Sequence, residues 1–306
     1  MSIFKMNIIQ AIRYLRKQKN IKQKEMLQSK RDYQTYNRIE TEQRKLNLTE
    51  LIEISNKLDM PIEELLSYCD YSKLKLIDKN FVLCTKLNIA TDNDFKQLID
   101  NYQYLKSINF KSTGELALYY DIKAVFTSKF PEIEEISKLD LHIIYRTVFN
   151  TNYFTYYDYR LVANTIILMD TKKGTKLINK LFPLEDRDMG NDKTLLVASR
   201  LIINFISGLI NNRKFAEAKQ YIQFAKNLAI DPTNYFFHFT IYYYENLILH
   251  FQTQKLKYLN KVYEYILLLE KTGHKEFAQS LELEIQKLIY SDDIVEVETT
   301  IVLREN

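Results

Sequence analysis

The chain has 306 residues, of which 46% are hydrophobic, and only five residues are Gly and four are Pro. This composition is typical of a globular protein, excludes a largely disordered chain and argues against a turn-rich β-sandwich. The net charge of +4 is too small for a protein coated in nucleic acid along its whole length. Two cysteines cannot form a disulfide framework, so a reduced, cytoplasmic setting is expected.

Residues 7–19 are predicted to form the first helix, because apolar residues recur there at intervals of three and four. Its basic side chains, Arg13 and Arg16 among them, are expected to face outward. The next two helices are short and are joined by a tight connection. They are predicted over residues 23–28 and 32–40.

The second of these short helices has one apolar and one polar face. Tyr36 and Ile39 lie three positions apart and can share the buried face. The opposite face carries amides, a hydroxyl and a guanidinium, which suit base edges and phosphates in a major groove. The predicted DNA contacts on and around this helix are Gln23, Lys24, Tyr33, Gln34, Thr35, Asn37, Arg38 and Arg44.

Positive charge is concentrated in the same region. Residues 1–45 contain twelve Lys and Arg and four Asp and Glu, a net charge of +8, so the rest of the chain carries −4. Neutralisation of phosphates requires such a concentration. For Arg38 a structural role stays open, because it can pair with Glu42 at i+4, and Glu40 can hold Arg13. A helical hairpin without any nucleic-acid role is the alternative for the whole region.

Roughly residues 5–68 resemble the lambda-repressor-like, or Cro/CI-type, helix-turn-helix family. The matching residues are Gln23, Glu25, Leu27, Arg38, Ile39, Glu40, Leu51, Leu58, Ile62 and Leu65. The resemblance implies that Gln23 contacts a phosphate and that Tyr33, Gln34, Thr35 and Asn37 lie in the groove. Residues 29–31, Ser-Lys-Arg, depart from the family pattern, which has a small residue between the two helices.

The helical period continues almost to the end of the chain. Helices are predicted over residues 79–90, 93–109, 113–129, 132–150, 155–170, 173–182, 192–211, 214–229, 233–253, 255–271 and 274–290. Pro131 and Pro232 are expected at helix starts, and Gly273 at a helix end. The predicted organisation is all-α, with a helix-turn-helix domain over 1–68, a linker over 69–78, a helical-repeat domain over 79–290 and an extended arm or strand over 291–306.

A weak internal repeat supports paired helices in an α-solenoid of tetratricopeptide-like type. The pattern Arg160-x-x-x-Asn164 recurs forty residues later as Arg200-x-x-x-Asn204, and Asn246 follows at a similar spacing. A basic helix-turn-helix domain joined to such repeats resembles the Rgg-like and PrgX-like peptide-pheromone receptors of Gram-positive bacteria. That resemblance implies a cytoplasmic homodimer, possibly a tetramer, that reads a double-stranded operator and is switched by a short signalling peptide, as in quorum sensing. It also implies that the carboxyl-terminal arm rearranges when the peptide binds.

The polar side chains of the repeats are predicted to line the peptide site. Asparagine amides can bond an extended peptide backbone, arginine can pair with a terminal carboxylate, and neighbouring aromatic residues can form apolar pockets. The predicted contacts are Arg160, Asn164, Arg200, Asn204, His238, Tyr242 and Asn246, with Tyr235, Phe236, Phe239 and Tyr243 as candidate pocket walls. The alternative is that these side chains only join one helix to the next.

No enzymatic, metal or cofactor site is predicted. The four histidines and two cysteines lack the spacing of metal ligands, and the five glycines form no phosphate-binding loop. No signal peptide is recognised, and no apolar stretch long enough to span a membrane is expected. Two other functions stay open: a DNA-binding repressor whose repeats only oligomerise, and a scaffold that docks proteins instead of DNA.

Overall fold

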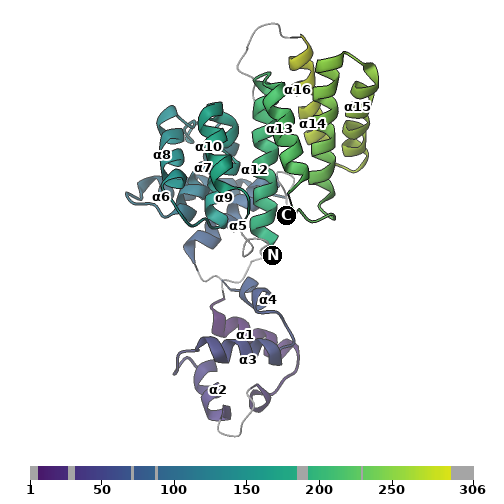
Figure 1. The fold of residues 1–306 in the computed structure, drawn as a ribbon. Helices are drawn as coiled ribbons and strands as arrows, with labels where there is room; N and C mark the ends of the chain where they lie inside the picture. Colours follow the sequence, from purple (N-terminus) through teal and green to yellow (C-terminus); the bar gives the residue numbers. More distant parts are fainter. Residues whose placement is uncertain are drawn as a thin grey trace. The chain divides into compact units, whose positions relative to one another are not determined.

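The computed structural model of the protein describes residues 6–26, 32–69, 72–86, 89–184, 192–228 and 230–290. All regular elements in these ranges are helical, which confirms the predicted fold class. The chain forms two compact units, Met1–Asn80 and Phe81–Asn306 (Figure 1). Helix α5, Lys73–Thr85, begins inside the segment predicted as a linker and spans the boundary between the units. The predicted arm over 291–306 lies outside the described residues.

The first unit packs short helices around one apolar core. Its elements are α1 (Ile8–Gln18), the 3₁₀ turn η1 (Gln23–Glu25), α2 (Asp32–Glu40), α3 (Leu48–Lys57) and α4 (Ile62–Ser67). This core includes the buried side chains of Ile12, Leu15, Met26, Tyr36, Ile54, Leu58 and Leu65. Tyr36 and Ile39 are both buried, as the helical spacing predicts. The helix predicted over 23–28 is a 3₁₀ turn in its described part, closed by a 3.0 Å bond from the Lys22 N–H to the Glu25 carboxylate.

The second unit stacks longer helices in two layers. Its elements are α6 (Asp92–Ser107), α7 (Thr113–Phe126), α8 (Lys138–Phe149), α9 (Tyr156–Ala163), the 3₁₀ turn η2 (Ile166–Leu168), α10 (Thr171–Leu181), α12 (Asp192–Asn211), α13 (Phe215–Lys226), α14 (Tyr235–Thr253), α15 (Leu256–Lys271) and α16 (Lys275–Tyr290). Helices α7, α9, α12 and α14 pack against one another in succession, and we call them the inner row. Their hairpin partners α8, α13 and α15 pack on them, as a solenoid of helix pairs requires.

Helix α5 lies at Lys73–Thr85 and not over the predicted 79–90, and two further predicted helix boundaries are wrong for local reasons. Helix α8 begins at Lys138 and not near Pro131, because Ser137 and Asp140 form a capping box that fixes its start. The helix predicted over 155–170 stops at Ala163, since Thr165 adopts φ −121° and ψ −15° and the chain continues as η2. By contrast Gly273, at φ +92°, ends α15 as predicted. Residues with a Cβ rarely adopt this backbone conformation.

Helix α12 is long and apolar enough to cross a membrane, contrary to the sequence expectation. An 18-residue window within its 20 residues has a mean hydropathy of 1.5, and 72% of that window is buried inside the unit. The helix contacts α9, α10, α13 and α14. Close approach to α10 depends on Gly174, where a Cβ would lie 2.8 Å from the Phe205 ring. Its apolarity is therefore that of a central core helix.

Helix α16 folds back onto the inner row through a buried acid. Ser207 of α12 donates a 3.2 Å hydrogen bond to Glu284, and Arg213 donates one of 3.1 Å to the Leu288 carbonyl. Glu284 is only 4% exposed, and burial raises its pKa to about 7 although the neighbouring Asn211 and Ser207 side chains act to lower it. The folded protein therefore favours the neutral form of this carboxyl group.

This carboxyl group should make stability depend on pH. The folded pKa lies above the ordinary value of 4.5, so the stabilising contribution is complete below about pH 4.5 and is lost as the pH rises toward 7. Glu284→Gln should therefore raise the melting temperature at pH 7.5 by roughly 5 °C and flatten its pH dependence between 5 and 7. Calorimetry from pH 5 to 8 measures both effects. Glu276→Gln, at an exposed position of α16, is the control and should change neither.

Candidate functional site

The outward face of α2 carries the polar side chains that the sequence assigns to DNA. Gln34 and Arg38 are exposed, and Thr35 and Asn37 are partly exposed. The Tyr33 side chain lies outside what the structure describes. Beside this face, on η1, Lys24 is exposed and Gln23 is partly exposed. These groups supply donors and acceptors of the kind that read base edges, together with cations that bind phosphate.

Glu40, the last residue of α2, holds this face in place. It is 2% exposed and forms an ion pair with Arg16 of 2.7 Å, while Arg13 lies 3.7 Å away. The Gln23 amide also donates to Glu40. Arg16 is therefore an internal partner, and the expectation that it faces outward is wrong. An amide nitrogen carries two hydrogens, so Gln23 can keep this bond and still donate to a phosphate.

The remaining basic candidates differ in their partners. Arg44 is held in an ion pair of 2.5 Å with Glu50 in the first turn of α3. Glu42, the alternative partner of Arg38, instead accepts a long hydrogen bond of 3.5 Å from Asn7. Arg38 is exposed to solvent. Of the two arginines, Arg38 is thus the one that can reach a phosphate without first leaving an ion pair.

In the second unit, Arg160 and Asn164 converge on one buried carboxylate. Arg160 donates from Nε to Asp121 at 2.6 Å, and Asn164 donates from Nδ2 to the other Asp121 oxygen at 2.7 Å. All three side chains are at most 8% exposed. We call this group the Asp121 clamp; it joins α7 to α9. A carboxylate of the protein therefore occupies the position that the sequence analysis gives to a peptide terminus.

The other predicted peptide contacts do not share one environment. Asn204 is fully buried and donates to the Ala163 carbonyl at 2.8 Å, which joins α12 to α9. Asn246 is buried and donates to the Tyr242 carbonyl of its own helix. Arg200 is partly buried on α12. Only His238 and Tyr242 are exposed, and both lie on α14. Whether these residues contact a ligand stays a prediction, but four of the seven, Arg160, Asn164, Asn204 and Asn246, are buried and already hydrogen-bonded inside the unit.

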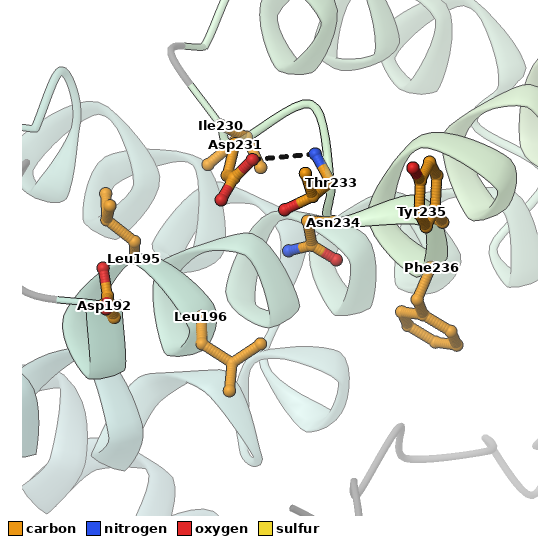
Figure 2. A pocket seen from close by; sticks show the side chains of 9 residues that line it. All are labelled: Asp192, Leu195, Leu196, Ile230, Asp231, Thr233, Asn234, Tyr235 and Phe236. Carbon is orange, nitrogen blue, oxygen red and sulfur yellow. Dashed lines mark hydrogen bonds between the residues drawn. The ribbon is translucent and has the colours of Figure 1, made fainter.

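A pocket of about 450 Å³ opens where α12 and α14 begin (Figure 2). It is lined by Asp192, Leu195, Leu196, Ile230, Asp231, Thr233, Asn234, Tyr235 and Phe236. Two of the four aromatic residues predicted as pocket walls, Tyr235 and Phe236, are among them. Tyr243 is not, because it is fully buried in the core. The pocket has room for one or two side chains of a ligand, and its lining combines apolar with polar side chains.

An exposed aromatic face of α14 continues from this pocket. Tyr235, Phe239 and Tyr242 follow one another at helical spacing and are 64%, 45% and 41% exposed. The Tyr235 and Phe239 rings stack with centroids 6.3 Å apart. His238 lies on the same side and donates to the Asp231 carbonyl at 3.1 Å. Exposed aromatic groups beside an apolar pocket are typical of a binding surface.

Sequence reasoning missed the partner residues of both regions. Asp121 stands in the otherwise apolar run Leu118-Tyr-Tyr-Asp-Ile122, and a lone acid in such a run is the signal that could have identified it. The pocket residues Asp192 and Asp231 carry no comparable signal, since they stand at helix ends and turns. Among the described residues, no three His, Cys, Asp or Glu side chains are grouped as metal ligands.

Residues 95–283 match the family described as the HTH-type transcriptional regulator Rgg, C-terminal domain. The chain belongs to this family. No curated protein resembles the sequence at a significant level. The match covers the repeat helices from α6 to most of α16, and so includes both the Asp121 clamp and the pocket.

Solved structures with the same fold extend over nearly the whole chain. One is a bacterial peptide pheromone/receptor complex, with 19% identity, a TM-score of 0.70 and coverage of 93% of this chain and 99% of the other. The PrgX/cCF10 complex gives 18% identity, a TM-score of 0.70 and coverage of 98% and 97%. The SHP pheromone receptor Rgg2 of Streptococcus dysgalactiae gives 15% identity, a TM-score of 0.69 and coverage of 92% of this chain and 99% of the other. At these identities the likeness establishes the fold.

The Asp121 clamp should be essential for the stability of the second unit. Asp121→Asn removes the negative charge and leaves Arg160 buried without a counter-ion, which should cost roughly 3–5 kcal/mol. The full chain should then unfold at a clearly lower temperature, as measured by calorimetry. Asp100→Asn, at an exposed position of α6, is the matched control and should leave the melting temperature unchanged. Equal melting temperatures for both variants would contradict the role assigned to the clamp.

Proposed function

We propose that the chain is a transcription regulator that binds a specific DNA sequence through its first unit and a short peptide through its second. Peptide binding would shift the protein between forms of different DNA affinity. The match of residues 95–283 to the Rgg family carries this proposal. It is supported by the similar fold of a bacterial peptide pheromone/receptor complex, the PrgX/cCF10 complex and the SHP pheromone receptor Rgg2.

For DNA, the proposed reading surface is the outward face of α2. Gln34 and Asn37 would bond base edges, Thr35 and Tyr33 would line the groove, and Arg38 would contact a phosphate. Lys24 and Gln23 would bind the backbone next to it. Arg44 is the weakest candidate, because it must exchange Glu50 for a phosphate. The net charge of +8 on residues 1–45 supports attraction to duplex DNA.

Two kinds of substitution should separate base reading from phosphate binding. Asn37→Ala or Gln34→Ala should relax the preference at one base position by about 1–3 kcal/mol. Lys24→Ala should weaken binding to all DNA sequences alike and lower the salt dependence of binding, since it removes one phosphate contact. Binding of the full chain to a randomised duplex library, followed by sequencing, measures both. Lys219→Ala, at an exposed position of α13, is the control. An unchanged sequence preference in both α2 variants would refute this assignment.

For the peptide, the proposed surface is the pocket together with the aromatic face of α14. Of the residues predicted from sequence, His238 and Tyr242 belong to this surface. Arg160, Asn164 and Asn204 are proposed to join helices, and Asn246 to bond its own helix; these four are not proposed as ligand contacts, because each is buried and already hydrogen-bonded. An extended peptide could place one side chain in the pocket and others along the rings of Tyr235 and Phe239.

Mass spectrometry of the protein purified from its natural host tests this proposal. A peptide of about five to ten residues should co-purify with the wild type. The double variant Tyr235→Ala/Tyr242→Ala should carry about tenfold less, because it loses two aromatic contacts. Tyr104→Ala is the control, since Tyr104 is an exposed tyrosine on α6, outside both proposed surfaces of the second unit. Absence of peptide from the wild type, or equal amounts in all variants, would contradict the proposal.

We also propose that the regulator is a homodimer joined through α15. Leu256, Tyr263 and Leu267 lie along one face of this helix and are 69%, 38% and 47% exposed. An exposed apolar face of this kind is suited to burial against a second copy. A dimer would also let two copies of α2 read paired half-sites.

A charge on this face should separate the subunits. Leu267→Glu should convert a dimer into a monomer at micromolar concentration, because a carboxylate would be buried without a partner. Light scattering of the full chain measures the mass. Leu139→Glu, at a leucine of α8 that is 68% exposed, is the control and should remain dimeric. A monomeric wild type, with and without DNA, would refute the dimer.

A further inference from the structure

The pocket at the start of α12 and α14 combines an apolar wall with two acids. Leu195, Leu196, Ile230 and Phe236 supply the wall, while Asp192 and Asp231 supply carboxylates, and no Lys, Arg or His is among the lining residues. Figure 2 shows both acids in the pocket lining, with Leu195 between them in the view. A site of this composition favours a ligand group that is both apolar and positively charged.

Both acids already have local structural roles, yet their charge remains. Asp231 accepts the Thr233 N–H at 2.7 Å, and this backbone bond lowers the pKa of its carboxyl group, so it is ionised at neutral pH. Asp192 is the exposed first residue of α12, where a carboxylate suits the positive end of the helix dipole. Neither role removes the negative potential that a ligand in the pocket would meet.

Charge also argues against the chain's own segments as occupants of this pocket. The last residues, 291–306, contain five Asp and Glu and one Arg, and residues 185–191 contain three Asp and Glu and one Arg. Both segments carry a net charge of the same sign as Asp192 and Asp231, so neither offers the complementary charge. A cationic ligand end has the opposite sign, and the exposed Tyr235 ring, which also lines the pocket, offers a face for a cation.

We infer that this pocket selects the peptide by a cationic group at or near one end, either a free amino terminus or a lysine side chain. The ammonium ion would lie between Asp192 and Asp231, and the adjoining apolar side chain would contact Leu195, Leu196 and Phe236. This inference rests on the proposed peptide-binding function and adds the charge of the peptide to it.

Four labelled heptapeptide libraries of Leu, Ile, Val, Ala and Phe test the inference. One has a free amino terminus, one is amino-terminally acetylated, one is acetylated with a single Lys, and one is acetylated with a single Glu. Immobilised full-length protein should retain the free-amine or Lys library about tenfold better than the neutral acetylated one, as expected for a charge-assisted bond. The Glu library should be retained least. Which of the two cationic libraries is preferred distinguishes the amino terminus from a side chain.

A charge-neutral pair of substitutions assigns the selectivity to the pocket. Asp192→Asn/Asp231→Asn should reduce the preference for cationic libraries to near unity and keep the circular dichroism spectrum. Asp92→Asn/Asp100→Asn is the matched control, because Asp92 is likewise the first residue of a helix and both side chains are exposed. The control should keep the preference of the wild type.

The possible failures are distinguishable. Equal retention of all four libraries by the wild type would overturn the charge selectivity and leave the proposed peptide binding intact. A preference that survives in the pocket variant would overturn the assignment to Asp192 and Asp231. Retention of none of the libraries would overturn the inference together with the peptide-binding function on which it rests.

Discussion

A buried carboxylate needs hydrogen-bond donors around it, and one such carboxylate in each unit, Glu40 and Asp121, fixes how neighbouring helices pack. In the second unit Asp121 binds Arg160 and Asn164, and the Asn204 amide continues the chain of bonds from α9 to α12. The inner row is thus joined by directional bonds as well as by apolar packing. Such bonds fix the register of one helix on the next, which packing of similar apolar side chains specifies less strictly.

Glu40 has the corresponding position in the first unit. It gathers Arg16 and Gln23 at the end of α2, so the polar groups of α1 and η1 turn inward at this point. The side chains of α2 that remain outside are then those with no such partner, Gln34 and Arg38 above all. The buried acid and the exposed reading face are therefore two results of one arrangement: the acid fixes the orientation of the helix, and that orientation exposes the amides.

Periodicity was sufficient to predict the class of fold and most of the helices. Apolar spacing located the long helices to within a few residues, since each buries one continuous stripe. It failed at α8 and after α9, where a capping box and the backbone of Thr165 set the boundaries. It also grouped Arg160, Asn164 and Asn204 correctly on one row of helices. Periodicity could not show whether that face contacts a ligand or another helix, because Asp121, which bonds Arg160 and Asn164, lies about forty positions earlier.

The pocket could not be predicted for a different reason. Its walls come from the first turns of α12 and α14 and from the turn before α14, and a cavity arises only when these are brought together. Aromatic composition did indicate α14, where Tyr235 and Phe236 were expected to form a wall. Within that helix, however, spacing alone did not separate the exposed Phe239 from the buried Tyr243, since both lie on broad apolar faces.

The Asp121 clamp has a consequence for how sequences of this family can diverge. The Asp121 carboxylate accepts hydrogen bonds from both Arg160 and Asn164. A change at any of the three positions therefore leaves a buried polar group without a hydrogen-bond partner. Drift through single substitutions is therefore disfavoured, whereas joint replacement of Asp121, Arg160 and Asn164 by apolar residues of similar volume can preserve stability. Among related chains these three positions should be inherited as a unit, either all polar or all apolar, even where the surrounding sequence has changed beyond recognition.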